Sequence, residues 1–433
     1  MTHTPSIPLA ASPATAGTVL IATLGSVGDI HPFLGLGQAL QRQGHAVRCM
    51  TSPVHAARVQ ASGLPFQPLG SVASFEAVAD DPALWDPRTA MTVVWRGLRN
   101  SLQALPEAAL ALPADAPASL LVHPLLLPAA ALARARRPGL RVVAAWLAPQ
   151  NLRTCHHPLT VGPLRIPRWL PMALRQGLWR QIDRRYIDPV VLPELNAARV
   201  AAGLPPVAHF IPHLGAVPDQ SVTLFPPWFA GTAPDWPQPL LRGRFPLFEP
   251  SADPALPQEV ADFLAAGTAP VVVTLGTFQR HGAPMVAQVV AAARALGRRT
   301  VVLGADRPPM PPAPADDLLW QPYLPLHQLL PHAAALVHHG GIGTTAEALR
   351  AAVPQLVLPW AFDQFDNAQR VVALGVGHTL QARRLRAAPL QAALRQLLGS
   401  PAIAAACRAS AERVSADPSL DDLCRQLWPA PAA

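Results

Sequence analysis

Short apolar runs recur along the chain, and several of them end in glycine-rich turns. The run at 18–24 is followed by a turn at 25–32, a stretch with one apolar face and a second run at 46–50. A buried strand, a tight turn, a helix and another strand in this order form the unit of a parallel sheet. The pattern predicts an α/β fold.

A second series of the same kind begins near residue 270. Residues 272–277 repeat the character of residues 21–26, and a helical stretch at 287–296 and a strand at 300–303 follow. A proline-rich run at 226–254 separates the two series, as expected of a linker. We therefore predict two Rossmann-like domains whose parallel sheets face a central cleft.

The domain boundaries follow from this pattern, since 433 residues exceed one ordinary core. We expect a loose tail at 1–16, an N-terminal domain at 17–235, a linker at 236–256 and a C-terminal domain at 257–433 with closing helices at its end. The tail lacks the basic and apolar regions of a signal peptide.

Composition narrows the class of protein. Half of the residues are hydrophobic and 14% are charged, which suits a globular enzyme. The net charge of +8 comes from scattered arginines in a chain without lysine, so it does not indicate a nucleic-acid partner. The four cysteines have no paired spacing, which fits a reducing, cytoplasmic location.

One segment, 165–186, is both basic and amphipathic. It carries six arginines, and apolar residues recur at every fourth position, namely Leu170, Leu174, Leu178 and Ile182. Two interpretations are open. Either the leucines pack on the N-terminal domain, or the helix makes peripheral contact with an anionic membrane surface, here the inner face of the cytoplasmic membrane.

The first candidate site is the turn after the apolar run at 333–337. Backbone amides in a glycine-rich turn and the start of the following helix favour an anion, and phosphate can accept hydrogen bonds from His339 and Thr344. The predicted site comprises His339, Gly340, Gly341, Gly343, Thr344 and Glu347. His338 and His339 are not expected to bind one metal ion, because adjacent strand residues point to opposite faces.

The next strand, 355–358, leads to Asp363 and Gln364. A carboxylate beside an amide offers acceptors and donors that suit sugar hydroxyls, and Trp360 could form an apolar wall. The alternative is that Asp363 simply caps the helix that follows.

The turn at 25–32 contains the candidate bases. Asp29 could accept a proton from a hydroxyl group, or it could only cap a helix that starts at Pro32. His31 is the rival base, since its ordinary pKa lies nearer neutrality.

Together these residues resemble the family 1 glycosyltransferases, which have the two-domain GT-B fold. The residues at 339–347, followed by Pro354, Pro359 and 363–364, resemble the donor-binding motif of that family. The resemblance implies that His339 and Thr344 contact a diphosphate and that Asp363 and Gln364 contact sugar hydroxyls. It also implies that Trp320 stacks on the nucleotide base, with Gly276 and Thr277 near the phosphates.

The amino-terminal turn resembles that of the bacterial and sterol branch, in which an Asp at the position of Asp29 is catalytic. Four further segments are similar to the rhamnosyltransferases of rhamnolipid synthesis, which move rhamnose from dTDP-rhamnose to a hydroxy-fatty-acid dimer. They lie at 81–87, 228–230, 235–240 and 245–248.

The resemblance thus implies an inverting, metal-independent enzyme that uses a nucleotide-diphosphate sugar as co-substrate. We expect transfer of a hexosyl group, in particular rhamnosyl from dTDP-rhamnose, to a hydroxyl of a lipid or other apolar acceptor. Three alternatives remain open: a glucosyltransferase using a UDP-sugar on a sterol or natural product, a sugar-nucleotide 2-epimerase, and a non-catalytic lipid-binding subunit.

Overall fold

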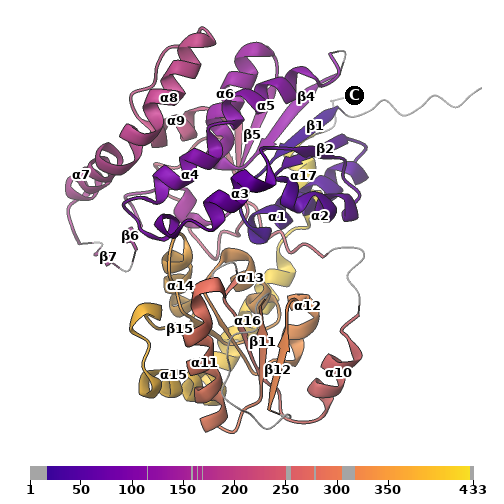
Figure 1. Cartoon of the computed structure of the whole chain (residues 1–433), viewed down its shortest axis with the longest axis vertical. Coiled ribbons are helices and arrows are strands. Elements are labelled where there is room, and N and C mark those ends of the chain that lie inside the picture. The colour runs from indigo at the N-terminus through magenta and orange to yellow at the C-terminus, as the bar shows by residue number, and fades with distance from the viewer. Residues whose placement is uncertain are drawn as a thin grey trace, which may run out of the picture.

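Two parallel sheets organise the chain, one in each half (Figure 1). The computed structural model describes residues 17–114, 116–157, 159–162, 164–167, 169–249, 255–276, 279–304 and 317–429. The predicted α/β class is confirmed, and each sheet forms a Rossmann-like domain with helices on its faces.

The first sheet has seven strands in the order β3-β2-β1-β4-β5-β8-β9. They are β1 (Thr18–Ala22), β2 (Ala46–Thr51), β3 (Phe66–Pro68), β4 (Ala118–Val122), β5 (Arg141–Trp146), β8 (Gln220–Thr223) and β9 (Leu240–Leu241). Because β9 pairs with β8, the first sheet extends into the predicted linker at 236–256.

The second sheet has six strands in the order β12-β11-β10-β13-β14-β15. They are β10 (Val271–Thr274), β11 (Thr300–Leu303), β12 (Leu318–Gln321), β13 (Ala335–His338), β14 (Gln355–Val357) and β15 (Gly377–Thr379). In both sheets the central strands are buried along their length, which explains their continuous runs of Val, Leu and Ile.

Helices cover both sheets. Those of the first half are α1 (Val27–Arg42), α2 (Ala56–Ala61), α3 (Val72–Ala79), α4 (Ala90–Leu98), α5 (Ser101–Leu110), α6 (Leu127–Arg136), α7 (Met172–Ile182), α8 (Asp188–Ala201) and α9 (Phe210–Ala216). Those of the second half are α10 (Gln258–Ala265), α11 (Gln279–Ala295), α12 (Leu326–Leu329), α13 (Ile342–Arg350), α14 (Gln364–Ala373), α15 (Ala387–Gly399), α16 (Pro401–Ala416) and α17 (Leu420–Leu427).

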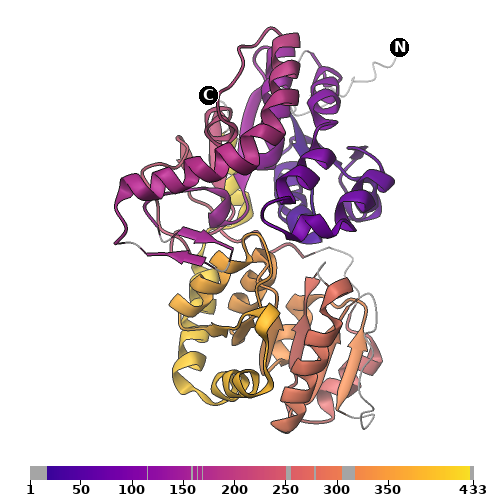
Figure 2. The same ribbon diagram turned by 60° about the vertical axis from the view of Figure 1, so that its left-hand side comes forward.

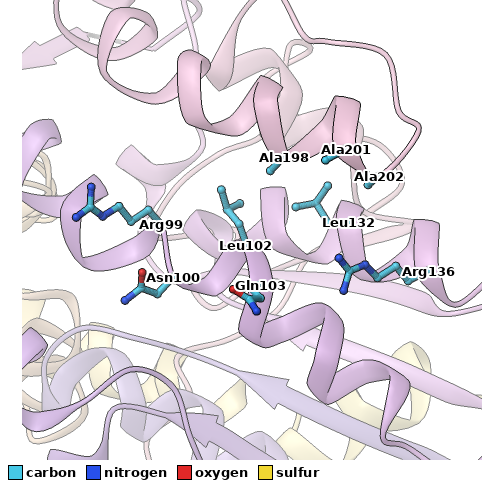
Figure 3. Close-up of a pocket in the computed structure, with 9 residues that line it drawn as sticks. All are labelled: Arg99, Asn100, Leu102, Gln103, Leu132, Arg136, Ala198, Ala201 and Ala202. Atoms are coloured by element: carbon cyan, nitrogen blue, oxygen red, sulfur yellow. The ribbon is translucent and has the colours of Figure 1, made fainter.

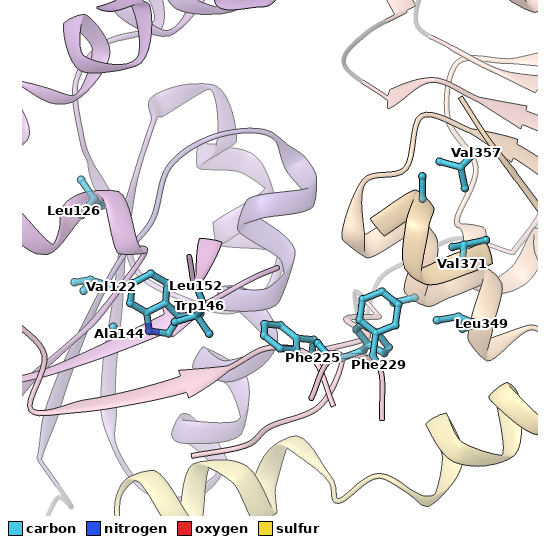
Figure 4. Close-up of a cluster of buried hydrophobic side chains, with 14 of the residues drawn as sticks. Val122, Leu126, Ala144, Trp146, Leu152, Phe225, Phe229, Leu349, Val357 and Val371 are labelled. Carbon is cyan, nitrogen blue, oxygen red and sulfur yellow. The ribbon is translucent and has the colours of Figure 1, made fainter. Parts of the chain in front are cut away.

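Aromatic residues of the segment after β8 join the two domains. Phe229 lies 5.0 Å from Phe245 between ring centroids, and its carbonyl accepts a hydrogen bond from Arg370 of α14. One hydrophobic cluster runs from Trp146 in the first domain through Phe225 and Phe229 to Val371 in the second (Figure 4). The two sheets are therefore held against each other by a continuous apolar contact.

The last helix corrects the predicted domain boundary. We expected both closing helices to belong to the C-terminal domain, but α17 packs against α1 of the first domain. Its apolar side, with Leu423, Cys424 and Leu427, is buried with the residues of α1. An amphipathic pattern shows that a helix has a face to bury but does not show which surface will cover it.

The basic segment also differs from expectation. The antiparallel hairpin of β6 (Leu159–Val161) and β7 (Leu164–Ile166) leads to α7. The hairpin lies close to the second domain, and α7 projects from the side of the first domain (Figure 2). Leu174 is 57% exposed, whereas Leu170, Leu178 and Ile182 are half-buried, so the predicted apolar face is only partly packed. Contact with a membrane stays a prediction, which binding to anionic lipid vesicles would test. Among the described residues, no helix is long and apolar enough to cross a membrane.

Candidate active site

The predicted turns lie at equivalent places in the two sheets. One connects β1 to α1, and the other connects β13 to α13; both strands are central in parallel sheets. The carboxyl ends of parallel strands, where these turns lie, form the usual ligand-binding edge.

Asp29 lies within the first turn of α1 and caps it through a capping box with Ser26, so the capping alternative is confirmed, although the predicted helix start at Pro32 is wrong. The helix begins at Val27, so Pro32 is inside it. One carboxylate oxygen, Oδ2, accepts hydrogen bonds from the backbone nitrogen of Ser26 at 2.7 Å and from its hydroxyl at 2.8 Å. The carboxylate folds back over Gly25, whose φ of +99° and lack of a side chain leave room for it.

Burial raises the pKa of the Asp29 carboxyl, although the two hydrogen bonds from Ser26 oppose the rise. Asp29 as a whole is partly exposed, but protein surrounds its carboxylate on most sides. Such a carboxylate is a stronger base than one in water. The chemistry available at this position is the removal of a proton from a nearby hydroxyl.

His31 is oriented towards a different neighbourhood. Its ring lies 5.3 Å from that of Phe248, which belongs to the segment between the domains. Burial, with the nearby charge of Arg58, lowers the pKa of His31 to about 4. Such an imidazole is neutral at physiological pH and is a weaker base than an ordinary histidine. The choice between Asp29 and His31 stays a prediction.

The glycine-rich turn of the second domain is fixed on both sides of Gly340. Its backbone nitrogen donates to Nδ1 of His338 at 3.2 Å, and its carbonyl accepts from the amide of Asn367 at 2.9 Å. Gly340 has a φ of +97°, which a residue with a side chain rarely adopts. His338 itself is fully buried and contacts Gln355 through Nε2 at 3.1 Å.

His339 lies between two glycines. A Cβ atom on either Gly276 or Gly341 would come within 3 Å of its imidazole, so both positions require glycine for the ring to fit. Burial lowers the pKa of His339 to about 4, and its Nδ1 has no hydrogen-bond partner among the described residues. The neutral ring can still donate one hydrogen bond to a ligand oxygen. Thr277 lies outside the described residues.

The start of α13 supplies the other elements of the predicted anion site. Thr344 and Gly343 lie in the first turn of this helix, Gly343 being exposed. Glu347 pairs with Arg350 at 2.6 Å, and Arg350 also pairs with Glu249 of the linker. Burial raises the pKa of Glu347 to about 7, with Arg350 opposing the rise.

Asp363 and Gln364 begin α14. Asp363 accepts a hydrogen bond from Asn367 at 2.8 Å, and burial raises its pKa to about 7. The amide oxygen of Gln364 accepts from the backbone nitrogens of Trp360 and Ala361, so its NH₂ group is the part left for a ligand. Asp363 occupies the N-cap position of α14, but its side chain makes no capping hydrogen bond. Its carboxylate and the amide of Gln364 retain the chemistry expected for sugar hydroxyls.

Two tryptophans of the predicted site are partly buried. Trp320 lies on β12, and its ring nitrogen has no hydrogen-bond partner among the described residues. Trp360 follows β14, and the guanidinium of Arg383 lies 4.7 Å from its ring.

One electrostatic interaction and one ring contact link the two halves of the site. The negative charge of Asp29 contributes to the raised pKa of Asp363, after burial, so the two carboxyl groups lie within electrostatic range of each other. In addition, Trp85 of the first domain meets Phe362, the residue before Asp363, edge to face, with ring centroids 5.8 Å apart. Trp236, by contrast, is buried in the first domain and donates to the carbonyl of Leu152.

Sequence reasoning missed the residues that support this site. Ser26 and His55 hold the first turn, the latter through a contact of 3.0 Å with the carbonyl of Gly25. Asn367 links the glycine-rich turn to Asp363. Its position one helical turn after Asp363 was the available signal, since residues four apart on a helix can meet.

A pocket of about 300 Å³ lies elsewhere in the first domain, between α4, α5, α6 and α8 (Figure 3). None of the predicted site residues lines it. Within the described parts of the chain, no three His, Cys, Asp or Glu side chains are grouped so that they could hold a metal ion.

Known proteins share this architecture. The family model described as glycosyltransferase family 28 N-terminal domain matches residues 19–112, and the model described as erythromycin biosynthesis protein CIII-like, C-terminal domain, matches residues 308–428. The O-mycaminosyltylonolide 6-deoxyallosyltransferase of Streptomyces fradiae is 30% identical over 431 residues, which cover 94% of this chain and 96% of that protein.

Solved structures agree on the fold. The glycotransferase of kitacinnamycin superposes with a TM-score of 0.72 at 22% identity, covering 95% of this chain and 98% of that chain. The spinosyn rhamnosyltransferase SpnG, complexed with thymidine diphosphate, gives a TM-score of 0.63 at 22% identity and covers 95% of this chain and 99% of that one.

The fold and the paired turns define a two-domain enzyme of the GT-B type. The chain belongs to the family 1 glycosyltransferases, as its sequence indicated, and it is a nucleotide-sugar-dependent glycosyltransferase. The nucleotide sugar is its co-substrate.

The contact between Asn367 and Asp363 generates a prediction. Replacing Asn367 with Leu removes a hydrogen bond that favours the ionised carboxylate, so the pKa of Asp363 should rise further above 7. If ionised Asp363 binds the donor sugar, the KM for the donor increases when Asp363 becomes protonated. In the variant this increase should begin at a pH that is higher by roughly one to two units. The measurement is the pH dependence of the donor KM.

Asn196 provides the matched control, because its amide also bonds twice within the protein, to the backbone of Val207. Asn196→Leu should lower stability without moving the pH profile. An unshifted profile in Asn367→Leu would contradict the assigned effect on Asp363.

Proposed function

We propose that the enzyme transfers a deoxyhexosyl group, rhamnosyl in particular, from a dTDP-sugar to a hydroxyl of an apolar acceptor with inversion at the anomeric carbon. The observation that carries this proposal is the pair of desolvated carboxyl groups, Asp29 and Asp363, contributed by opposite domains. One is suited to the acceptor hydroxyl and the other to the hydroxyls of the donor sugar.

In the proposed reaction the acceptor oxygen attacks the anomeric carbon of the donor. The bond between that carbon and the phosphate oxygen breaks, and the nucleoside diphosphate leaves with the bonding electrons. Asp29 accepts the proton of the attacking hydroxyl. Its raised pKa makes the carboxylate a better match for this proton than a fully solvated Asp would be.

The leaving diphosphate would bind at the start of α13. Backbone amides of the glycine-rich turn, the helix dipole, His339 and Thr344 together favour negative charge at this point. The two hydrogen bonds that hold Gly340 in place support this role. Hydrogen-bond donors that are already oriented need not reorganise during the reaction.

Two features support a deoxyhexosyl donor. The segment 81–87, which resembles rhamnosyltransferases, includes Trp85, which contacts Phe362 and adds an apolar surface beside Asp363. An apolar surface suits the methyl group of a 6-deoxy sugar. Relatives whose names contain 6-deoxyallosyl and rhamnosyl groups, and neighbours solved with dTDP, are consistent with this class.

The acceptor proposal has two forms. The segments similar to rhamnolipid enzymes favour a hydroxylated fatty acid, whereas the relatives named for O-mycaminosyltylonolide and for vancomycin aglycone favour a natural-product scaffold. A UDP-glucosyl donor remains the alternative donor. A screen of dTDP- and UDP-sugars by thermal shift, followed by assays with both acceptor classes, tests these choices. Turnover of the donor without any acceptor would instead support an epimerase, and no turnover with any acceptor would support a lipid-binding subunit.

Replacing Asp29 with Asn tests the proposed base. The substitution should lower kcat by at least roughly 100-fold, because the amide cannot accept the proton. The dissociation constant for dTDP, measured by calorimetry, should stay unchanged. Activity of the unaltered enzyme should fall with decreasing pH through a pKa above the ordinary Asp range. Near-normal turnover in Asp29→Asn, with loss in His31→Ala, would assign the base to His31.

Replacing His339 with Ala tests the diphosphate site. Loss of one hydrogen bond to a charged group should weaken dTDP and UDP binding by roughly 10- to 100-fold. His332, exposed in the same domain, serves as the control, and His332→Ala should bind both nucleotides normally. Equal affinities in His339→Ala and the unaltered protein would refute the assignment.

A further inference from the structure

His55 contacts the turn that carries Asp29, although it is distant from that turn in the chain. It ends the short connection between β2 and α2, and it is 4% exposed. Its Nε2 atom lies 3.0 Å from the carbonyl oxygen of Gly25. The turn after β1 is therefore held by the segment that follows the neighbouring strand, β2.

The contact falls on the same peptide group that holds Asp29. The carbonyl of Gly25 and the backbone nitrogen of Ser26 belong to one planar trans unit, in which they point in opposite directions. His55 is bound on the carbonyl side, and on the other side the Ser26 nitrogen donates to Oδ2 of Asp29 at 2.7 Å. One rigid group thus joins the imidazole to the carboxylate.

A glycine makes this peptide group easy to turn. Gly25 has a φ of +99°, and the carboxylate of Asp29 occupies the space that a Cβ atom would take. Glycine fits this position, but it restricts rotation about its backbone bonds least of all residues. The contact with His55 supplies an anchor from outside the turn, which keeps the Ser26 N–H directed at the carboxylate.

The same contact determines where the imidazole carries its proton. A carbonyl oxygen only accepts hydrogen bonds, so Nε2 of His55 must donate, and Nδ1 of the neutral ring has no proton. Burial lowers the pKa of His55, the bond to Gly25 opposes the fall, and the charge of Arg58 adds to it. The ring is therefore neutral at physiological pH and acts as a donor of one hydrogen bond.

Packing alone does not account for a histidine at this position. The ring meets Phe75 of α3 edge to face, with centroids 5.6 Å apart, and a phenylalanine could make the same contact. Nδ1 of His55 is buried without a hydrogen-bond partner among the described residues, which is unfavourable unless water pairs with it. What an imidazole provides here, and an apolar ring does not, is the donor at Nε2.

We propose that His55 is a positioning residue for the transfer reaction, because it fixes the peptide group that holds the carboxylate of Asp29 in place. This inference rests on the proposed function in taking Asp29 as the base. His55 acts through the peptide group and exchanges no proton with the acceptor. A donor bound to the carbonyl of Gly25 also polarises the peptide group, which strengthens the bond from Ser26 to the ionised carboxylate.

Three other charged or titratable groups interact with this pair. His31 lies on the same helix as Asp29, and Arg58 of α2 acts electrostatically on His31 and His55. Asp363 of α14 interacts with Asp29 from the other domain. All three stay in place when only position 55 is changed, so a change in the titration of Asp29 is then due to that position.

The titration of Asp29 tests the proposal without turnover. NMR of the carboxyl carbons, in enzyme with isotope-labelled aspartate, gives the pKa of Asp29, whose signal is assigned by its loss in Asp29→Asn. Replacing His55 with Leu removes the donor, so the pKa of Asp29 should rise by roughly one unit. Replacing His55 with Gln, whose amide can reach the same carbonyl, should leave that pKa unchanged.

His213→Leu is the matched control, because His213 is another buried histidine of the first domain and also has a nitrogen without a partner among the described residues. It should leave the pKa of Asp29 unchanged. An unmoved pKa in His55→Leu would overturn the proposal, and so would an equal rise in His55→Gln, since both variants lose the imidazole. If His55→Leu does not fold, His55→Phe, which keeps a ring against Phe75, takes its place.

Kinetics then connects the position of Asp29 with transfer. His55→Leu should lower kcat by roughly 10- to 100-fold, as expected of a displaced base, and His55→Gln should restore most of the loss. The dissociation constant for dTDP should stay unchanged, because the predicted diphosphate site lies in the second domain. Adding His55→Leu to Asp29→Asn should cause no further loss of kcat, and a further loss would overturn the proposal.

The base assignment and the role of His55 fail separately. Near-normal turnover in Asp29→Asn would reject Asp29 as the base, while the NMR titration still decides whether His55 holds its carboxylate. An unchanged kcat in His55→Leu, together with an inactive Asp29→Asn, would keep the base and overturn the role of His55.

Discussion

The apolar contact between the domains is the constraint on which the active site depends. Phe225, Phe229 and Phe245 connect the core of the first domain with α13 and α14 of the second, and α17 returns to pack on α1. These contacts keep the carboxyl edges of two parallel sheets opposite each other. Each edge alone offers one turn, and glycosyl transfer needs a donor and an acceptor side by side.

Once the edges face each other, burial determines the chemistry of the carboxyl groups. Asp29 and Asp363 are both largely surrounded by protein, and the charge of Asp29 adds to the effect of burial on the pKa of Asp363. Both pKa values rise, which strengthens the proposed base but also brings Asp363 close to protonation near neutral pH. The hydrogen bond from Asn367 opposes that protonation, so a residue outside the recognised motif sustains the ionised form of a residue within it.

Several buried polar atoms of the described residues lack hydrogen-bond partners, and they include Nδ1 of His339 and the ring nitrogen of Trp320 at the predicted site. Others, such as the hydroxyl of Ser221 and the ring nitrogen of Trp146, lie elsewhere in the first domain. An unpaired buried group reduces stability unless water or a ligand pairs with it. The atoms of His339 and Trp320 are therefore placed to pair with a bound donor.

The sequence alone determined the α/β class, the two strand–turn–helix units and the family, because buried parallel strands and glycine-dependent turns are local features that leave their pattern in the chain. It also located the glycine-rich turn and the Asp363–Gln364 pair. Only the tertiary structure decided where α1 begins, that α17 packs on the first domain, that His31 faces Phe248 and that α7 leaves Leu174 exposed. Each of these depends on which surface an element meets, and residues distant in the chain supply that surface.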